Sequence, residues 1–249
     1  MRYDSTSIPE RYHDARALAP DDLRYWVSLV EQVLPPEARG VVIDVGCGTG
    51  RFSVPLAEHL GVPVVGIDPS RRMLEEAGRS AGSPRVTYRE GSAEAIPVEA
   101  GSVALVFMSN AFHHVRDLDQ ALRELARVLV PGGIVFLRNY SRENLDSLDY
   151  LRFFPEALTV SRAMLWPRGR LVEAFTARAF ALVAQRTVRQ EAAPDFEAYV
   201  AKIRSRVYSD LALIPDEAFH RGMAELEGDH RSGAGGPVME ELDCFVFRR

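Results

Sequence analysis

The stretch VVIDVGCGTGRFSVPL, residues 41–56, decides the fold of this chain of 249 residues. Apolar and β-branched residues lead into Asp44, and glycines follow at every second position, Gly46, Gly48 and Gly50. The run after the last glycine has the pattern of a helix. Glycine permits a positive φ and a close approach of a ligand, and a helix N-terminus offers unpaired N–H groups. A strand, a glycine turn and a helix therefore predict a site for a nucleotide or a carboxylate.

The composition is that of an ordinary globular α/β protein. Hydrophobic residues make up 47% of the chain and charged residues 26%, which excludes a disordered chain. A net charge of −5 argues against tight binding to a phosphate backbone. Cys47 and Cys244 give no disulfide framework. Neither a secretory signal nor a run of apolar residues long enough to span a membrane is present, so we expect a cytoplasmic protein.

Strand and helix patterns alternate along the chain. Runs rich in valine, isoleucine and leucine predict strands at residues 41–45, 63–68, 85–89, 102–108 and 134–137. Helix patterns fall at residues 21–34, 51–60, 70–79 and 116–129. The segment 131–133, Pro-Gly-Gly, predicts a turn before the fifth strand. Buried strands that alternate with helices are typical of a parallel sheet covered on both faces.

The ends of these strands predict one ligand crevice. Gly46, Asp68, Ser92 and Ser109 each come just after a different predicted strand. Ligands of open α/β sheets bind at the carboxyl ends of the strands, so we expect the four loops to converge there.

The glycine spacing separates two chemistries. Dinucleotide enzymes use G-x-G-x-x-G, whereas the spacing here is G-x-G-x-G and Arg51 stands where the third glycine should be. Asp44, ahead of the glycines, suits an amine better than a pyrophosphate. Asp68 suits a ribose diol, because a carboxylate accepts from both hydroxyls. A nicotinamide-dependent oxidoreductase is therefore disfavoured.

Five segments, in this order and spacing, resemble class I S-adenosylmethionine-dependent methyltransferases of the type 11 group. The segments are VIDVGCGTG, VVGIDPS, GSAEAIP, FMSNAFHHV and RVLVPGG, within residues 38–140. The resemblance implies a Rossmann-like fold, with a seven-stranded, mostly parallel sheet, an antiparallel last strand and helices on both faces. It also implies S-adenosylmethionine as the cofactor and a methyltransferase activity.

The resemblance implies a set of cofactor-binding residues. They are Asp44, Gly46, Cys47, Gly48, Gly50, Asp68, Pro69, Met73, Ser92, Ala93, Glu94, Ser109 and Asn110. By this resemblance the glycine turn packs against the methionine and ribose, Asp44 orients the amino group and Asp68 holds the ribose hydroxyls. Pro69 and Met73 flank the adenine. The acid that the family often places at the adenine amine is absent here, so a backbone N–H, the Ser92 hydroxyl or Glu94 must replace it.

Two pairs of residues are further candidates. Tyr12 and Arg16 would lie one turn apart on an N-terminal helix and could close over the cofactor. His113 and His114 are candidate catalytic bases. Neighbours on a helix diverge by about 100°, so at most one histidine should face the substrate. No third ligand accompanies them at helical spacing, so no metal site is expected.

We expect three parts in the chain. Residues 1–37 are an N-terminal helical segment over the cofactor site, and residues 38–140 are the cofactor-binding core. Residues 141–249 supply strands six and seven, at 181–190 and 242–247, a helix at 171–180 and helical cap insertions at about 141–166 and 191–237. The cap is rich in aromatic residues and should form the substrate chamber. Its candidate lining residues are Tyr140, Tyr150, Phe153, Phe154, Trp166, Tyr199, Arg206 and Tyr208.

The loop after the fourth strand bears on the substrate. Residues 109–112, Ser-Asn-Ala-Phe, lack the prolines of the N/D-P-P-Y/F loop that many nucleic-acid and protein N-methyltransferases carry. With the acidic charge and the aromatic cap, this favours methyl transfer to an O, N or C atom of a small, partly apolar molecule. A quinone, a phenol or a natural-product intermediate is the leading hypothesis, in a monomer or homodimer that binds neither nucleic acid nor membrane.

Two alternatives remain open at this point. An RNA or protein methyltransferase would need a basic face, for which the candidate residues are Arg162, Arg168, Arg170, Arg204 and Arg206. A non-catalytic partner subunit would bind S-adenosylmethionine without turnover. The intact glycine turn and Asp68 count against lost cofactor binding.

Overall fold

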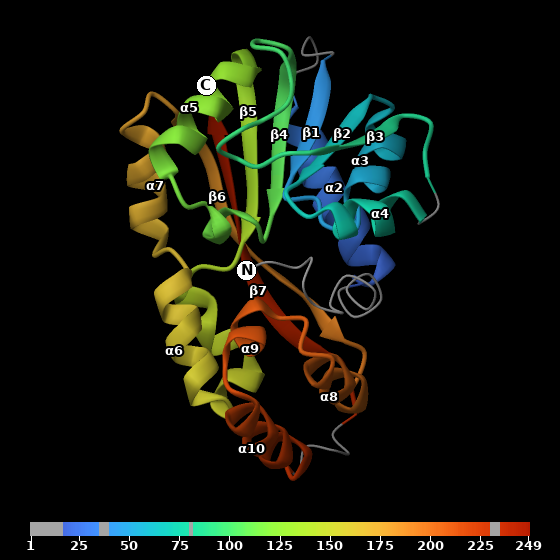
Figure 1. The fold of residues 1–249 in the computed structure, drawn as a ribbon, viewed down its shortest axis with the longest axis vertical. Helices are drawn as coiled ribbons and strands as arrows, with labels where there is room; N and C mark the ends of the chain where they lie inside the picture. The colour runs from blue at the N-terminus through green and yellow to red at the C-terminus, as the bar shows by residue number, and fades with distance from the viewer. Residues whose placement is uncertain (1–16, 35–39, 80–81, 230–234) are drawn as a thin grey trace.

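A seven-stranded sheet runs through the molecule (Figure 1). The computed structural model describes residues 17–34, 40–79, 82–229 and 235–249. The strand order is β3-β2-β1-β4-β5-β7-β6. The strands are β1 (Val41–Val45), β2 (Val64–Asp68), β3 (Val86–Glu90), β4 (Val103–Ser109), β5 (Leu129–Asn139), β6 (Ala181–Ala193) and β7 (Val238–Arg248). Strands β1 to β5 are parallel, and β7 is antiparallel to both of its neighbours, which confirms the expected fold class.

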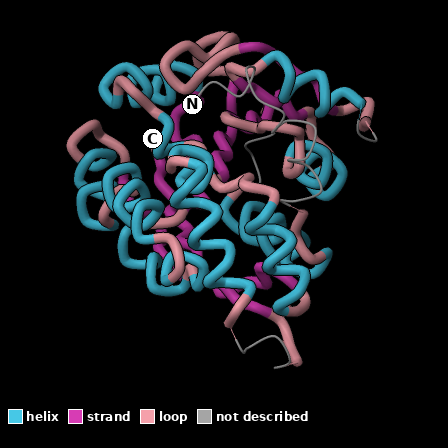
Figure 2. Tube along the Cα trace, turned by 60° about the horizontal axis from the view of Figure 1, so that its bottom comes forward, coloured by secondary structure: helices cyan, strands magenta, loops and turns pink. Residues whose placement is uncertain are grey.

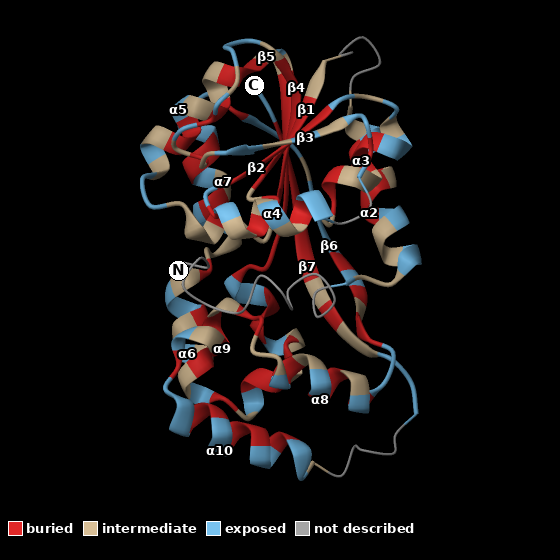
Figure 3. Ribbon diagram, turned by 45° about the vertical axis from the view of Figure 1, so that its right-hand side comes forward, coloured by how far each residue is buried: buried red, intermediate tan, exposed pale blue. Residues whose placement is uncertain are grey.

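Helices cover both faces of the sheet. They are α2 (Pro20–Val33), α3 (Ser53–Leu60), α4 (Arg71–Arg79), α5 (Leu118–Val128) and α7 (Arg168–Thr176). Figure 1 places α2, α3 and α4 on one side of the sheet and α5 and α7 on the other. Trp26, Phe52 and Leu56 belong to the core of the first side, and Leu125 and Phe175 to that of the second. The central strands are buried, and exposed residues lie on the outer faces of the helices (Figure 3).

The helix predictions for the first half of the chain are confirmed, with ends shifted by at most two residues. Ser70 caps α4, because its Oγ accepts a hydrogen bond from the N–H of Met73 at 3.2 Å. The helix expected at 171–180 instead spans Arg168–Thr176. Within the described residues, no helix has the length and apolar character needed to cross a membrane.

The Pro-Gly-Gly segment is a bulge within a strand and not a turn ahead of one. Strand β5 already begins at Leu129, and its pairing with β4 jumps from Leu129 to Ile134. Gly132 has a φ of +78°, and its N–H donates to the carbonyl oxygen of Arg249. The N–H of Arg249 donates to the carbonyl oxygen of Gly133. Arg249 thus provides hydrogen-bond partners for Gly132 and Gly133, which the bulge leaves without partners on β4.

A long β6–β7 ribbon carries the helical cap. Both strands are longer than the sequence pattern predicted, and they stay paired from Ala181 with Arg248 to Ala193 with Val238. The cap contains η3 (Arg142–Ser147), η4 (Asp149–Arg152), α6 (Pro155–Met164), α8 (Phe196–Arg204), α9 (Ser209–Leu213) and α10 (Asp216–Glu227). Figure 2 turns this end of the molecule forward, so that the cap helices lie in front of the strands.

The first part of the cap insertion expected at about 191–237 forms two helices, α8 and α9. Arg206 has a φ of +55°, which ends the first helix before α9 begins. Its guanidinium donates to the carbonyl oxygens of Leu211 and Ile214 and pairs with Asp216. These bonds hold the turn between α8 and α10 and account for the unfavourable φ.

Gly222 allows α10 to pack on the rest of the cap. A Cβ at this position would lie 2.5 Å from Cδ1 of Phe154 and 2.6 Å from the carbonyl oxygen of Phe153. Gly222→Ala should therefore lower the free energy of unfolding by about 1–3 kcal/mol, measured by urea titration. Gly78→Ala, in α4, is the matched control, since its Cβ meets nothing within 4 Å, and it should raise stability by about 0.5–1 kcal/mol. Equal stability of the two variants would contradict this packing.

Candidate functional site

The turn between β1 and α3 is shaped by its glycines and held by the end of β2. Gly46, Gly48 and Gly50 have φ values of +74°, +55° and +78°. The N–H of Gly48 donates to Oδ2 of Asp68, and the N–H of Ser70 donates to Oδ1, both at 2.9 Å. A carboxylate has about four acceptor positions, so a group oriented by two N–H donors is well suited to a diol. Two of the predicted residues, Gly48 and Asp68, are thus brought into direct contact.

Tyr88, which the sequence analysis did not single out, explains two of the glycines in this region. It pairs with Gly66 across β2 and β3, and a Cβ on Gly66 would lie 2.6 Å from Cδ1 of its ring. A Cβ on Gly50 would overlap its hydroxyl oxygen. Burial raises the pKa of Tyr88 to about 12, so its phenol stays protonated. The small size of Gly50 and Gly66 therefore serves the packing of the chain's own tyrosine.

Asp44 is buried at the base of the glycine turn. Its Oδ2 accepts a hydrogen bond of 2.7 Å from Oγ of Ser53, the first residue of α3. Burial raises the pKa of Asp44 to about 7, while the Ser53 bond and the charge of Arg51 act in the opposite direction. The carboxyl group thus titrates near neutral pH, where an incoming cation would favour its charged form.

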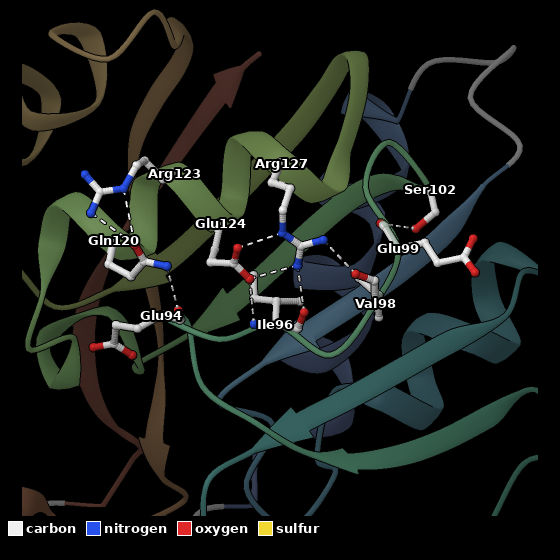
Figure 4. Close-up of polar contacts among 9 residues, drawn as sticks. All are labelled: Glu94, Ile96, Val98, Glu99, Ser102, Gln120, Arg123, Glu124 and Arg127. Carbon is white, nitrogen blue, oxygen red and sulfur yellow. Dashed lines mark hydrogen bonds and ion pairs between the residues drawn. The ribbon is translucent and has the colours of Figure 1, made fainter.

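The loop that follows β3 is fastened to α5 (Figure 4). Arg127 donates to the carbonyl oxygens of Ile96 and Val98, and Glu124 accepts from the N–H of Ile96. Gln120 donates to the carbonyl oxygen of Glu94 at 3.2 Å. These contacts fix the backbone that carries Ser92 and Ala93 beside the end of β2.

The Glu94 carboxylate is directed toward the start of α5. It accepts from the N–H of Arg116 at 2.7 Å and from that of Asp117 at 3.4 Å. Partial burial acts to raise the pKa of Glu94, but the hydrogen bonds from the backbone N–H groups have the larger combined effect. The pKa of Glu94 is therefore below its usual value. Of the three candidates for an adenine contact, the Glu94 carboxylate is thus committed to the helix, and it also accepts a hydrogen bond from the Ser92 hydroxyl, so a backbone N–H of the loop is the third.

The end of β4 rests on a buried arginine. Asn110 has a φ of +50°, and its N–H donates to the carbonyl oxygen of Arg138 at 2.7 Å. The Arg138 guanidinium donates to Oγ of Ser109 at 3.0 Å and lies over the Trp26 ring, 4.7 Å from its centroid. Sequence analysis missed Arg138, whose only signal was a charge directly after the apolar run at 134–137.

A buried polar network continues from this arginine into the cap ribbon. Arg138 donates to Oε1 of Gln190 at 2.6 Å, and Trp26 donates to the same oxygen at 2.8 Å. The amide nitrogen of Gln190 donates to Glu240 at 2.6 Å, and the Tyr208 hydroxyl donates to the other oxygen of Glu240 at 3.4 Å. The network thus joins the end of β4 to the cap, and it hydrogen-bonds charges that burial would otherwise make costly.

A cavity lies between the end of β4 and the cap. It offers about 60 Å³ of space to water-sized molecules, within a hollow of about 520 Å³ that includes its opening to solvent. Its apolar lining residues are Leu148, Met164, Leu165 and Val207. Its polar lining residues are Asn110, His113, Tyr140, Tyr150, Ser161, Tyr208, Ser209 and Asp210.

The structure brings some of the expected lining residues to this cavity and not others. Tyr140, Tyr150 and Tyr208 line it. Phe154 packs instead against the rings of Tyr150 and Phe219. The Tyr199 hydroxyl accepts from the N–H of Tyr150.

Arg206 also has a structural role, in the turn described above. Ser161, Ser209 and Asp210 line the cavity but carried no signal in the sequence, because no motif surrounds them.

The two histidines form η2 (Phe112–His114), a short 3₁₀ helix after β4. Their ring centroids lie 4.1 Å apart. His113 lines the cavity, whereas Nε2 of His114 lies 3.4 Å from Oγ of Ser209. Burial lowers the pKa of His114 to about 4, so its imidazole is neutral at pH 7 and able to accept a proton.

The remaining candidates complete the arrangement. Met73 is buried in α4, the helix that follows the end of β2 and Pro69. Tyr12 and Arg16 lie outside the described residues. In the part of the chain that is described, no group of three or more histidine, cysteine, aspartate or glutamate residues is placed to hold a metal ion.

Comparisons with known proteins agree with this geometry. Residues 43–137 match the family model described as a methyltransferase domain. The chain is 35% identical over 147 residues to an uncharacterized methyltransferase of Mycobacterium bovis, covering 59% of this chain and 58% of the relative. It is 36% identical over 104 residues to a ubiquinone biosynthesis O-methyltransferase of Caulobacter vibrioides, covering 41% of each chain.

The chain thus spans less than two thirds of the length of these curated relatives. The crystal structure of the [4+2]-cyclase SpnF superposes with a TM-score of 0.65 at 19% identity, covering 95% of this chain and 84% of that one. At this identity the likeness shows the shared fold alone.

Asp44 should make stability depend on pH. Its pKa in the folded protein, about 7, lies above the ordinary value of 3.8, so ionisation favours the unfolded state between these values. Compared with Asp44→Asn, the wild-type protein should lose stability as the pH rises from about 4 to 7, on the order of 4 kcal/mol in total, and change little above that. Urea titrations of both proteins across this range measure the difference. A difference that stays constant with pH would contradict the buried environment of Asp44.

Proposed function

We propose that this chain methylates a small, partly apolar molecule. The premise is that residues 43–137 belong to the class I S-adenosylmethionine-dependent methyltransferase family. The observation that carries the proposal is the position of the cap cavity. Asn110 lines the cavity and directly follows β4, whose carboxyl end lies at the same edge of the parallel sheet as those of β1 and β2. A molecule in the cavity would therefore lie next to the cofactor.

The residues of the crevice fit S-adenosylmethionine. When bound, this cofactor supplies a methyl group made electrophilic by its sulfonium. Asp68, oriented by two backbone N–H donors, would hold the ribose hydroxyls, and Asp44 would face the amino group. Ser92 and Ala93 would meet the adenine from the fastened loop after β3. Ser109 and Asn110 would contact the methionine part.

Charge pairing on the cap and on α7 supports a small acceptor over RNA. Of the five arginines considered for a basic face, four pair with neighbouring acids. The pairs are Arg168 with Asp243 at 2.7 Å, Arg170 with Glu173 at 3.4 Å, Arg204 with Glu227 at 2.9 Å and Arg206 with Asp216 at 2.5 Å. These pairs offset the positive charge that a nucleic-acid surface needs. The relative named an O-methyltransferase also supports a small acceptor.

The chain's own contribution to the reaction would be positioning, exclusion of water and removal of a proton. The cavity would hold the acceptor beside Asn110, with its apolar residues excluding water. An acceptor O–H or N–H must lose a proton when its oxygen or nitrogen receives a methyl group. His113 lines the cavity, and His114, neutral at pH 7, lies next to Ser209, so this pair is our candidate for the base.

Asp68→Ala should weaken the binding of S-adenosylmethionine and S-adenosylhomocysteine about tenfold or more, because charge-assisted hydrogen bonds to the ribose are lost. Isothermal titration with both compounds, and with NAD in parallel, measures this. Glu90→Ala, at the end of β3 and paired with Arg71 on the surface, is the matched control and should bind as the wild type does. Unchanged affinity of Asp68→Ala would place the ribose elsewhere. Failure of the wild-type protein to bind either adenosyl compound would overturn the proposed cofactor.

His114→Asn should lower kcat by on the order of a hundredfold and leave the affinity for S-adenosylhomocysteine unchanged, because a base acts on the acceptor and not on the cofactor. The acceptor is first found by screening phenols, quinones and RNA with labelled methyl donor. Since burial lowers the pKa of His114 to about 4 in the free protein, kcat/KM of the wild type should stay level from about pH 8 to 5.5 and fall below that. His59→Asn, which removes an exposed histidine paired with Glu31, is the control. Unchanged kcat in His114→Asn would exclude this residue as the base.

A further inference from the structure

A buried carboxylate in the cap orients two hydroxyl groups of the cavity wall. Asp210, in α9, is only 5% exposed. Its Oδ2 accepts from the Tyr150 hydroxyl at 2.7 Å and from the Ser161 hydroxyl at 2.5 Å, and its Oδ1 accepts from the N–H of Leu211 at 2.8 Å. Tyr150 and Ser161 come from η4 and α6, so three separate cap elements meet at this carboxylate.

These hydrogen bonds fix what Tyr150 and Ser161 can offer to a ligand. A hydroxyl group has a single hydrogen, and in both residues it is used on Asp210. Their oxygens then act toward the cavity only as acceptors. Burial and the nearby Asp210 charge raise the pKa of Tyr150 well above its usual value, so its phenol keeps this hydrogen.

A third hydroxyl of the wall has the same polarity. Tyr208 lines the cavity and directs its hydroxyl toward a second buried carboxylate, that of Glu240. Among the described residues that line the cavity there is no lysine or arginine. A carboxylate or phosphate placed here would lose its hydration without meeting an opposite charge, whereas an O–H or N–H group would meet acceptors.

We infer that the acceptor substrate presents a hydrogen-bond donor, a hydroxyl or an amine, to Tyr150 and Ser161, and that a molecule with a carboxylate or phosphate at this point is rejected. The inference rests on the proposed function, because it takes the cavity as the acceptor site. It narrows the acceptor to a neutral or cationic molecule with an apolar body and a donor end. Asp210 is in this view a positioning residue, which acts through the two hydroxyls it orients.

Binding of three probes of similar shape tests this inference without turnover. Phenol has the donor, anisole lacks it, and benzoate carries a negative charge. Their dissociation constants are measured by ligand-observed NMR with saturating S-adenosylhomocysteine. The wild-type protein should bind phenol about fivefold or more tightly than either of the others. Equal binding of the three probes, or a preference for benzoate, would overturn the inference.

Variants test the role of the carboxylate. In Asp210→Asn the amide can donate to a hydroxyl, whose hydrogen then turns toward the cavity, so the preference for phenol over anisole should fall to about twofold or less. Tyr150→Phe and Ser161→Ala each remove one acceptor and should reduce the same preference, which keeps the test decisive if Asp210→Asn fails to fold. Tyr25→Phe, at a tyrosine that is 46% exposed, is the matched control and should bind as the wild type does. A phenol preference unchanged in all three cavity variants would overturn the inference.

Titration with S-adenosylhomocysteine alone separates this inference from the proposed function. If the cofactor product binds and the probes are not discriminated, the inference fails and the proposed cofactor stands. If the cofactor product does not bind, the proposed function fails, and the probe series repeated without it still measures the polarity of the cavity.

Discussion

The buried guanidinium of Arg138 is the interaction on which the arrangement of core and cap depends. It is 1% exposed, so its charge must be hydrogen-bonded within the protein. Its partners lie on different elements: Ser109 on β4, Gln190 on β6 and the ring of Trp26 on α2. A shift of the β6–β7 ribbon against the parallel sheet would remove Gln190 from this charge, and a shift of α2 would remove the Trp26 ring. The position of the cap over the strand ends is therefore fixed from inside the core.

Gln190 links Arg138 to Glu240 in one fixed orientation of its amide. Its amide oxygen accepts from Arg138 and Trp26, and its amide nitrogen donates to Glu240. Because both ends of the amide are used, the side chain cannot turn over without losing hydrogen bonds at either end. The positive charge near Ser109 and the negative charge of Glu240 near Tyr208 are thereby kept apart.

Local sequence signals predicted the sheet and the crevice, because they depend on short-range pattern. Apolar runs mark the strands, and the glycine turn and Asp68 lie at strand ends that a parallel sheet brings together. The buried networks depend on pairing across long separations: Gln190 meets Glu240 only through the register of β6 and β7. The same limit explains Gly50, whose size is required by Tyr88 from another strand. Arg206 looked like a cavity residue because its turn at positive φ cannot be read from a helical pattern.

The cap joins substrate selection to its own stability. Asp210 fixes the polarity of the cavity wall, and it also holds η4, α6 and α9 together through Tyr150, Ser161 and its backbone bond to Leu211. A substitution that reverses the polarity must therefore disturb the contacts between these elements. Val207 and Met164, by contrast, line the cavity without such bonds, so they can change its shape while the polar wall stays in place. Substitutions that adapt the cavity to an acceptor of another size should therefore disturb the fold less than substitutions that adapt it to a molecule presenting a hydrogen-bond acceptor in place of a donor.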